Sequence, residues 1–313
     1  MGLIVNGVWV DKWYPTEESE GEFVRQESRF RNEISAENGA LYKPEKGRYH
    51  LYVSLACPWA HRTLIFRKIK QLEDIISISI VQPKMLTNGW EFGAEGESLY
   101  ALNYMYQLYL KSAPDYQGRV TVPVLWDKKT QTIVNNESAE IIRIFNSAFN
   151  DITGNSDDYY PEGLRHEIDQ INDRIYETVN NGVYRAGFAT TQAAYEKAYC
   201  ALFETLDWLE KRLASQRYLA GDSITEADWR LFTTLIRFDA VYHGHFKCNR
   251  QRLSEFPNIS HYVRALYQIQ GVRETVDLAY TKEHYYGSHL SINPTGIIPL
   301  GPVLDFDRPH NRA

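Results

Sequence analysis

The first regular pattern of apolar and polar residues begins near residue 48. Residues 49–54 alternate apolar and polar positions, which predicts a strand. A helical spacing of apolar residues then runs from Pro58 to Leu72, with proline at the first helical position, where its missing N–H costs nothing. Residues 76–80 alternate again and predict a second strand. This order of elements predicts a right-handed βαβ unit with a parallel pair of strands.

A Gly- and Tyr-rich stretch, residues 83–118, interrupts the pattern, and we interpret it as a long insertion. Alternation resumes at residues 120–126, and residues 132–134 follow a short turn, so a hairpin is expected. Glu137 then opens an amphipathic helix. The whole order predicts an α/β domain over residues 46–150.

The second half of the chain is predicted to be helical. Thr225 and Asp228 approximate a capping box, and Pro257 opens another helix. Six residues step by four and three positions along one helix face: Tyr195, Tyr199, Leu202, Leu206, Leu209 and Leu213. We expect Cys200, in the same helix, to belong to the core.

The predicted fold class is therefore α/β plus all-α. We place the helical domain at residues 159–285, after a polar break. Residues 1–45 are interpreted as an irregular extension without a domain of its own, and residues 286–313 as an irregular tail.

Composition excludes several classes of function. A net charge of −6 and the lack of any Lys/Arg run make nucleic acid an unsuitable partner. The apolar stretches are too short and interrupted for a transmembrane helix, and no secretory signal is visible at the N-terminus. Three cysteines form no disulfide framework, so a reducing, cytoplasmic setting is expected.

Cys57 is the strongest candidate for chemistry. It follows a predicted strand and precedes a predicted helix, where unpaired backbone N–H groups and the helix dipole favour a thiolate. The pKa of this thiol is therefore expected to fall from about 8.5 into the range ~3.5–7.5. A dithiol oxidoreductase would carry a second cysteine at position 60, where this chain has Ala60. A single thiol requires an external one, such as glutathione, whereas the alternative is a buried structural cysteine.

Several runs of residues resemble one known family. The turn Cys57–Thr63 is similar to the active-site turn of omega-like glutathione transferases. More specific runs resemble the xi class, the glutathionyl-hydroquinone reductases, over nearly the whole chain: residues 121–125, 136–138, 183–189, 238–248, 284–289 and 292–296.

The resemblance implies a thioredoxin-like N-terminal domain, a helical C-terminal domain and a glutathione site. It implies that Pro123 is cis and that the backbone of Val122 pairs with the cysteinyl part of glutathione. Glu137 and Ser138 are implied to hold the γ-glutamyl end, and Trp90 to lie beside the glutathione. From the residues alone, Glu137 is simply a favourable acid at a helix start, and Trp90 a loop aromatic that covers the core.

The resemblance also implies the reaction. Tyr184, Tyr242 and Tyr285 match positions that line a hydroquinone pocket, where phenols stabilise developing charge on oxygen. Cys57 is implied to remove glutathione from glutathionylated hydroquinones, and a second glutathione, as co-substrate, releases oxidised glutathione. A homodimer and no metal are implied too.

Alternatives stay open at this point. The same Cys57 suits a general glutathione thioltransferase or dehydroascorbate reductase, and the fold also suits a non-enzymatic binding scaffold. His243, His245 and Cys248 have a metal-like spacing, but no partner cluster is evident, so a structural role is favoured. Arg62 is interpreted as an ordinary surface or interdomain contact.

Overall fold

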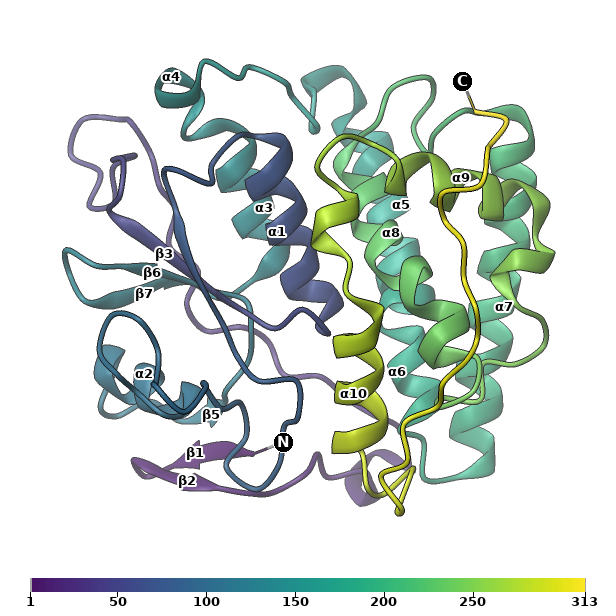
Figure 1. The fold of residues 1–313 in the computed structure, drawn as a ribbon, viewed down its shortest axis with the longest axis horizontal. Helices are drawn as coiled ribbons and strands as arrows, with labels where there is room; N and C mark the ends of the chain where they lie inside the picture. The colour runs from purple at the N-terminus through teal and green to yellow at the C-terminus, as the bar shows by residue number, and fades with distance from the viewer. Residues whose placement is uncertain (1, 313) are drawn as a thin grey trace. The chain divides into compact units, whose positions relative to one another are not determined.

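The computed structural model describes residues 2–312 and divides the chain into two compact units (Figure 1). The first, the α/β unit, comprises the residues up to Trp13 together with Gln26–Asp157. The second, the helical unit, comprises Tyr14–Arg25 and the residues from Asp158 onward. The N-terminal segment thus contributes to both units.

A four-stranded mixed sheet forms the centre of the α/β unit, in the order β4-β3-β6-β7. Strand β3 (Tyr49–Val53) is parallel to β4 (Ser77–Ile80) and antiparallel to β6 (Val124–Asp127). Strand β7 (Thr132–Asn135) completes the hairpin with β6. Every residue of β3 is buried, as expected for a central strand. The predicted βαβ unit and hairpin are both confirmed.

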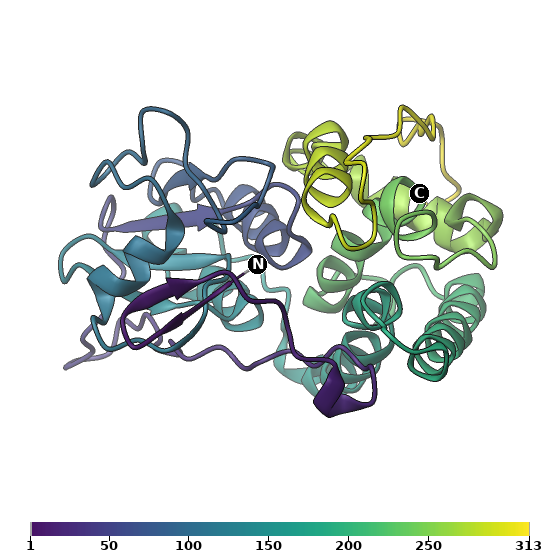
Figure 2. The same ribbon diagram turned by 90° about the horizontal axis from the view of Figure 1, so that it is seen from below.

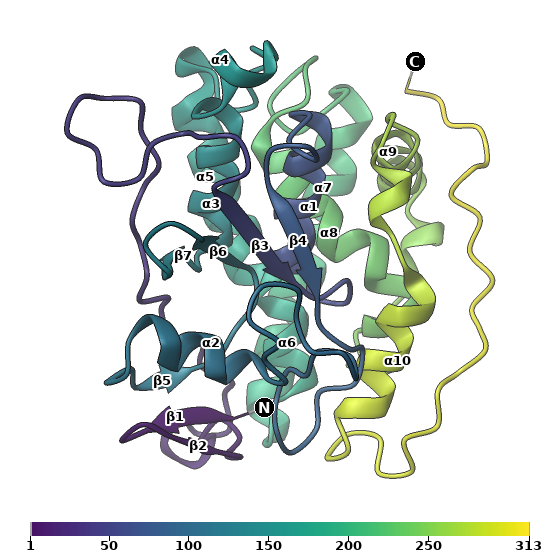
Figure 3. The same ribbon diagram turned by 60° about the vertical axis from the view of Figure 1, so that its left-hand side comes forward.

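Three helices accompany this sheet (Figures 1 and 3). Helices α1 (Pro58–Ile69) and α3 (Ser138–Ser147) pack against each other, while α2 (Met105–Ser112) contacts β7. Because α2 lies inside residues 83–118, that stretch is not a simple loop insertion. This helix has only eight residues, so its apolar spacing is weak in the sequence.

The beginning of the chain is more ordered than predicted. Strands β1 (Leu3–Val5), β2 (Val8–Val10) and β5 (Gly118–Arg119) form a second, antiparallel sheet; Figure 3 labels all three, and Figure 2 shows β1 and β2 in purple. Asn6 and Gly7 connect β1 and β2 with φ values of 50° and 75°. Positive φ at both central residues is typical of a two-residue hairpin turn. An Asn-Gly pair favours this turn, because both residues tolerate positive φ.

The helical unit is built around α8 (Glu226–Arg237), all of whose residues are buried. The predicted capping box at its start is confirmed, because Asp228 Oδ2 accepts hydrogen bonds from the backbone N–H and the hydroxyl of Thr225. The other helices of the unit are α5 (Arg165–Ile175), α6 (Gly182–Gly187), α7 (Gln192–Ser215), α9 (Pro257–Tyr267) and α10 (Leu278–Ser288). Two π-helical segments, Tyr176–Asn180 and Phe238–Tyr242, follow α5 and α8.

Short helical turns complete the secondary structure: α4 (Asn150–Thr153) and the 3₁₀ turns Glu17–Ser19, Glu162–Leu164, Leu253–Glu255 and Arg273–Thr275. None of the helices within residues 2–312 has the length and apolar character needed to cross a bilayer.

The C-terminal segment beyond Ser288 has neither helix nor strand over its described residues, and α10 occupies the first positions that we assigned to the tail. Side chains nevertheless hold it in place. Lys282 Nζ donates to the carbonyls of Pro299 and Leu300, at 3.1 and 2.8 Å. Near the end, the buried guanidinium of Arg312 donates to the backbone carbonyls of four residues, Leu213, Gln216, Arg217 and Asn258.

Candidate functional site

Cys57 stands at the N-cap of α1, immediately before Pro58. Its carbonyl accepts the N–H of His61 at 2.9 Å, so the residue begins the helix while its own backbone stays extended. The side chain is half-buried. A thiol at a helix N-cap lies at the positive end of the helix dipole, which favours its thiolate form.

The loop before β6 lies against this thiol. The Cys57 Sγ donates a hydrogen bond to the Val122 carbonyl over 3.5 Å. The Val122–Pro123 peptide bond is cis, which confirms what the resemblance implied, and both residues are buried. Two of the predicted glutathione-binding residues are therefore brought to the candidate nucleophile.

The start of α3 carries Glu137 and Ser138. The Glu137 carboxylate accepts the N–H of Ala139 at 3.1 Å and the hydroxyl of Ser28 at 3.1 Å, so it acts as the N-cap of the helix. Ser138 is buried, and its Oγ accepts a hydrogen bond from Arg62 Nη1 at 3.3 Å.

We predicted a surface or interdomain contact for Arg62, and its burial contradicts the surface alternative. This residue is only 1% exposed, and its guanidinium lies 4.5 Å from the centre of the Trp59 ring. A buried arginine links the first turn of α1 to the start of α3, because its planar fork reaches Ser138 while its face stacks on the indole. One arginine in a helix has no periodicity that would reveal such a role in the sequence.

Trp90 is buried in the segment that precedes α2. Its carbonyl accepts the N–H of Met105 at 2.9 Å, which ties this segment to the first residue of α2. The structure therefore gives Trp90 a fixed position in the α/β unit.

In the helical unit, the three predicted tyrosines converge. The hydroxyl of Tyr285, from α10, lies 2.5 Å from that of Tyr184, from α6, and 3.1 Å from that of Tyr242. Tyr242 closes the π-helical segment after α8. Three residues separated by up to 101 positions thus form one hydrogen-bonded chain of phenols, here called the tyrosine cluster.

Burial keeps Tyr285, the central member of the tyrosine cluster, protonated. Tyr285 is 1% exposed, and burial, followed by the neighbouring phenols of Tyr184 and Tyr242, raises its pKa well above the ordinary value for tyrosine. Tyr285 is therefore a neutral phenol at physiological pH, and it can donate a hydrogen bond or a proton to an oxyanion. Tyr184 is the half-exposed member.

The Phe246 ring packs against two members of the tyrosine cluster. This buried ring stacks on Tyr242, with ring centres 5.5 Å apart, and lies equally close to Tyr184. Gly187 makes this approach possible, because a Cβ at that position would lie 2.2 Å from the Phe246 ring. Phe246 stands in a run that carried the family resemblance, but its supporting role could not be assigned without the packing.

Arg25 and Phe23 reach the same cluster from the N-terminal segment. The Arg25 guanidinium lies 5.1 Å from the Tyr184 ring centre, and its Nε donates to Asn181 Oδ1 at 3.3 Å. Phe23 stacks at 6.5 Å from Tyr184. A cation over the face of an aromatic ring is attracted by the negative charge of that face, so Arg25 helps to hold the Tyr184 ring in place. Sequence reasoning missed both residues, since residues 1–45 were interpreted as an extension.

The residues with metal-like spacing, at positions 243–248, make separate contacts in the structure. His245 Nε2 lies 3.1 Å from His289 Nδ1, and burial lowers the pKa of His245 to about 4. The pKa of His289 is held well below its ordinary value by burial and then by His284. The Cys248 thiol is buried, which raises its pKa, and it donates to the Phe246 carbonyl. Over residues 2–312, no group of three or more potential ligands has a geometry that could hold a metal ion.

Cys200 is exposed, so its predicted place in the core was wrong. It directly follows Tyr199 and therefore points about 100° away from the buried stripe of α7. Its neighbours Leu202 and Leu206, which belong to that stripe, are fully buried.

Comparisons with known proteins agree with this architecture. The family model for the glutathione S-transferase N-terminal domain matches residues 56–148, and that for the glutathione S-transferase C-terminal domain matches residues 192–265. The fold and these matches define a glutathione transferase, with a thioredoxin-like domain followed by a helical domain.

Individual relatives show to which class within the glutathione transferases the chain is similar. The chain is 54% identical to the glutathionyl-hydroquinone reductase YqjG of Escherichia coli, covering 100% of this chain and 98% of the relative. It is 55% identical to the glutathionyl-hydroquinone reductase PcpF of Sphingobium chlorophenolicum, covering 97% of each.

Solved structures agree. Glutathione-bound YqjG superposes with a TM-score of 0.91 at 51% identity, over 99% of each chain. A xi-class transferase from Natrialba magadii gives a TM-score of 0.93 at 48% identity, over 100% of this chain and 96% of the other. The chain belongs to the glutathionyl-hydroquinone reductase family, the xi class of the glutathione transferases.

Proposed function

We propose that this protein reduces glutathionyl-hydroquinones to hydroquinones with glutathione as the reductant. The observation that carries the proposal is the single thiol of Cys57, placed at a helix N-terminus and hydrogen-bonded to the Val122 carbonyl. Two relatives that are 54% and 55% identical over 98% and 97% of their length bear the name of this activity.

The reaction proceeds in two thiol exchanges. The Cys57 thiolate attacks the sulfur of the glutathionyl group, the bond from sulfur to the ring carbon breaks, and that carbon takes up a proton. The products are the hydroquinone and a disulfide between Cys57 and glutathione. A second glutathione, as thiolate, attacks this disulfide, which releases oxidised glutathione and restores the Cys57 thiolate. The ring carbon is reduced, and the thioether sulfur and one thiol sulfur are oxidised to one disulfide.

The tyrosine cluster supplies the proton chemistry in this proposal. Before the attack, the hydroquinone tautomerises to a ketone, and a neutral phenol polarises its oxygen. Tyr285 suits this role because its raised pKa keeps it protonated, and the hydrogen bond to half-exposed Tyr184 offers a path for the proton.

Glutathione is held by the α/β unit in this proposal. The Val122 backbone, before Pro123, pairs with the cysteinyl part, while Glu137 and Ser138 bind the γ-glutamyl end. The N-terminus of α3 favours the carboxylate of that end, and the buried Arg62 that donates to Ser138 adds positive charge there. Trp90 lies beside the bound tripeptide.

Steady-state kinetics with a glutathionyl-hydroquinone test this function on the wild type, Cys57→Ser and Cys57→Ala. We expect turnover in the wild type and a loss of at least about 10³-fold in both variants, because neither supplies a thiolate. Turnover of a simple glutathione mixed disulfide, but none of the thioether, would favour a general thioltransferase. No turnover of either substrate, with no glutathione adduct on Cys57 by mass spectrometry, would favour the binding scaffold.

We also propose that the protein is a cytoplasmic homodimer. Three cysteines that form no disulfide suit a reducing compartment, and Cys200 is an exposed thiol that an oxidising compartment would modify. Light scattering during size-exclusion chromatography tests the assembly: twice the mass of one chain supports the proposal, and a single-chain mass contradicts it.

A further inference from the structure

Tyr184 is the member of the tyrosine cluster whose ring is least fixed by burial. Tyr242 and Tyr285 are 0% and 1% exposed, whereas Tyr184 is half-exposed and stands on α6, a helix of six residues. Its hydroxyl must nevertheless stay within hydrogen-bond distance of Tyr285 if the two phenols are to share a proton. Because a half-exposed side chain keeps rotamer freedom, further contacts must hold this ring.

Arg25 makes two contacts that hold Tyr184. Its guanidinium lies 5.1 Å from the centre of the Tyr184 ring, a distance at which a cation is attracted to the ring face. Its Nε donates to Asn181 Oδ1 at 3.3 Å. Asn181 is buried at the N-cap of α6, and its carbonyl accepts the N–H of Tyr184 at 3.0 Å. One side chain therefore contacts both the phenol ring and the start of the helix that carries it.

The segment before Arg25 is fixed to the loop between α6 and α7. The Gly21 carbonyl accepts the N–H of Thr190 at 3.0 Å, and the Thr191 hydroxyl donates to the carbonyl of Glu20 at 2.9 Å. A Cβ at Gly21 would lie 2.6 Å from the Thr191 side chain, so the segment and the loop are in close contact. Arg25 thus extends from backbone that is already held, which limits the entropy lost when its side chain is ordered.

Arg185 follows Tyr184 directly, but its charge is committed elsewhere. Its guanidinium forms ion pairs with Glu22 and Glu177, both at 3.1 Å. The first of these pairs is a further anchor for the segment that precedes Arg25. Arg185 therefore fixes the segment, and Arg25 places its charge over the phenol ring.

We propose that Arg25 is a positioning residue for the reduction of glutathionyl-hydroquinones: its guanidinium, fixed by Asn181, holds the Tyr184 hydroxyl against that of Tyr285. This inference rests on the proposed function and adds a residue to it.

The position of Tyr184 matters for one of the two kinds of sulfur chemistry that Cys57 can perform. Reduction of the thioether needs the ketone tautomer and a proton for the ring carbon, so it needs the tyrosine cluster. Exchange with a simple mixed disulfide expels a thiolate and needs no proton from a tyrosine. Loss of Arg25 should therefore slow thioether reduction and leave disulfide exchange as it is.

Steady-state kinetics of the full-length protein with a glutathionyl-hydroquinone and with the mixed disulfide of cysteine and glutathione test the proposal. Arg25→Met is expected to lower kcat for the thioether about tenfold, because the cation over the ring is lost. The KM for glutathione and the turnover of the disulfide should not change. Arg25→Lys keeps a cation without the planar fork, and its kcat should lie within about threefold of the wild type.

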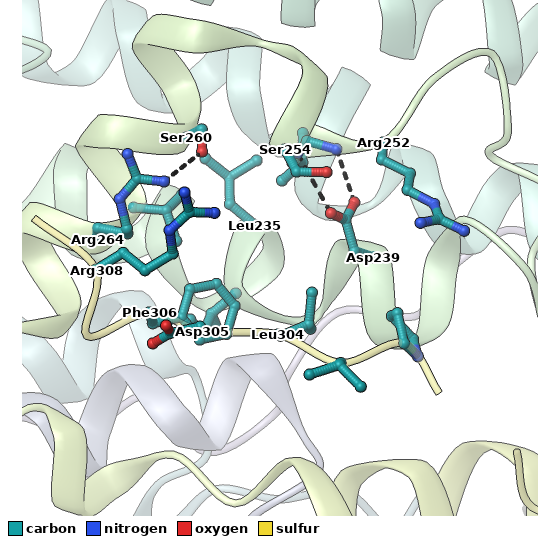
Figure 4. A pocket seen from close by; sticks show the side chains of 15 residues that line it. Leu235, Asp239, Arg252, Ser254, Ser260, Arg264, Leu304, Asp305, Phe306 and Arg308 are labelled. Atoms are coloured by element: carbon teal, nitrogen blue, oxygen red, sulfur yellow. Dashed lines mark hydrogen bonds between the residues drawn. The ribbon is translucent and has the colours of Figure 1, made fainter. Parts of the chain in front are cut away.

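Two other arginines of the helical unit serve as controls. Arg165 also lies over a phenol ring, 5.2 Å from the centre of Tyr160, and its Nε donates to the Tyr160 carbonyl at 3.3 Å. Arg264 is half-exposed like Arg25, lies in the wall of the cavity shown in Figure 4, and donates to Ser260 Oγ at 2.9 Å. Neither contact involves the tyrosine cluster, so Arg165→Met and Arg264→Met should turn over both substrates like the wild type.

A ¹⁹F NMR measurement follows the ring itself. With 3-fluorotyrosine in place of Tyr184, Arg25→Met should shift the ¹⁹F resonance of the folded protein, and Arg165→Met should not. An unshifted resonance in Arg25→Met contradicts the positioning, whether or not the wild type turns over the thioether.

The kinetic outcomes separate this proposal from the proposed function. If the wild type reduces the thioether and Arg25→Met does so equally well, or if Arg25→Met loses activity on both substrates alike, the role of Arg25 is wrong and the function stands. A wild type without thioether turnover would instead overturn the function. Arg25→Gln, which also lacks the charge, replaces Arg25→Met if that variant does not fold.

Discussion

At the scale of single residues, position in the fold separates reactive groups from inert ones of the same type. Cys57 caps a helix and is half-buried, Cys248 is sealed in the core with a raised pKa, and Cys200 is exposed on a helix face. The environment of Cys57 could be predicted because the Cys-Pro pair marks a helix start. The exposure of Cys200 could have been predicted, because this residue lies off the apolar face that the helical spacing of α7 identifies.

The tyrosine cluster could be predicted only through the family resemblance. With 22 tyrosines in the chain, no periodicity identifies three that meet across more than 100 positions. The supporting residues Phe246, Gly187 and Arg25 were missed, because packing rather than residue type defines their roles.

Tyr285→Phe should lower turnover of a glutathionyl-hydroquinone by about 10²-fold, because it removes the central phenol that donates to the developing oxyanion. The KM for glutathione should not change. Stopped-flow or steady-state kinetics measure both. Tyr199→Phe, a change in α7 outside the cluster, is the control and should behave as the wild type. Equal turnover in both variants would remove Tyr285 from the mechanism.

Gly187→Ala should destabilise the protein by about 1–3 kcal/mol and also reduce turnover, since the new methyl group displaces Phe246 from behind Tyr184 and Tyr242. Urea denaturation measures the loss of stability, and steady-state kinetics measure the loss of turnover. At Gly163, an added Cβ meets nothing within 4 Å, so Gly163→Ala should leave both quantities unchanged. A Gly187→Ala variant with unchanged stability and turnover would contradict the packing described.

At the scale of elements, the helices and strands with a strong local sequence pattern were predicted correctly. Those that depend on tertiary packing were not. The βαβ unit, the hairpin, α7 and the capping box of α8 follow from alternation, helical spacing and cap residues. Helix α2 and the β1–β2 hairpin were missed, because elements of eight and three residues carry little periodicity. Their stability comes from packing on the rest of the α/β unit.

Asp228→Ala tests the element that organises the helical unit. The carboxylate accepts hydrogen bonds from Leu219, Thr225 and Tyr262, all buried, so its loss should cost at least about 2 kcal/mol in urea denaturation. Asp277→Ala removes the exposed cap of α10, where Asp277 accepts the N–H of Tyr280, and should cost about 1 kcal/mol. Similar losses would mean that burial adds nothing to the α8 cap.

At the scale of the whole molecule, the two units are each closed around their own core, and residues 14–25 tie the N-terminal segment to the helical unit. Glu22 forms ion pairs with Arg185 and Lys197. The sequence predicted an α/β part and a helical part, but not that one extension belongs partly to each. Its residues are polar and irregular, so only tertiary contacts reveal the division.

Buried histidines in both units set the dependence of stability on pH. Burial lowers the pKa of His50 and of His245 from 6.5 to about 4. Between these values the unfolded chain binds more protons than the native one, so stability is complete above pH 6.5 and falls as the pH drops towards 4. Each histidine contributes about 3 kcal/mol at most to this loss.

Urea denaturation from pH 7.5 to 4 measures this dependence. His50→Gln should flatten the slope below pH 6.5, since one buried titrating group is removed. His166→Gln, at an exposed position, should leave the slope as in the wild type. A stability that is constant between pH 6.5 and 4.5 would contradict the burial of these imidazoles.

The central claim is that Cys57 removes glutathione from a hydroquinone ring and carries it as a disulfide. Mass spectrometry after a single turnover without free glutathione tests it most directly. The account predicts one glutathionyl group per chain on Cys57, an equal amount of hydroquinone, and release of the adduct as oxidised glutathione when glutathione is added. Hydroquinone formed with no adduct on Cys57, or formed equally by Cys57→Ser, would contradict it.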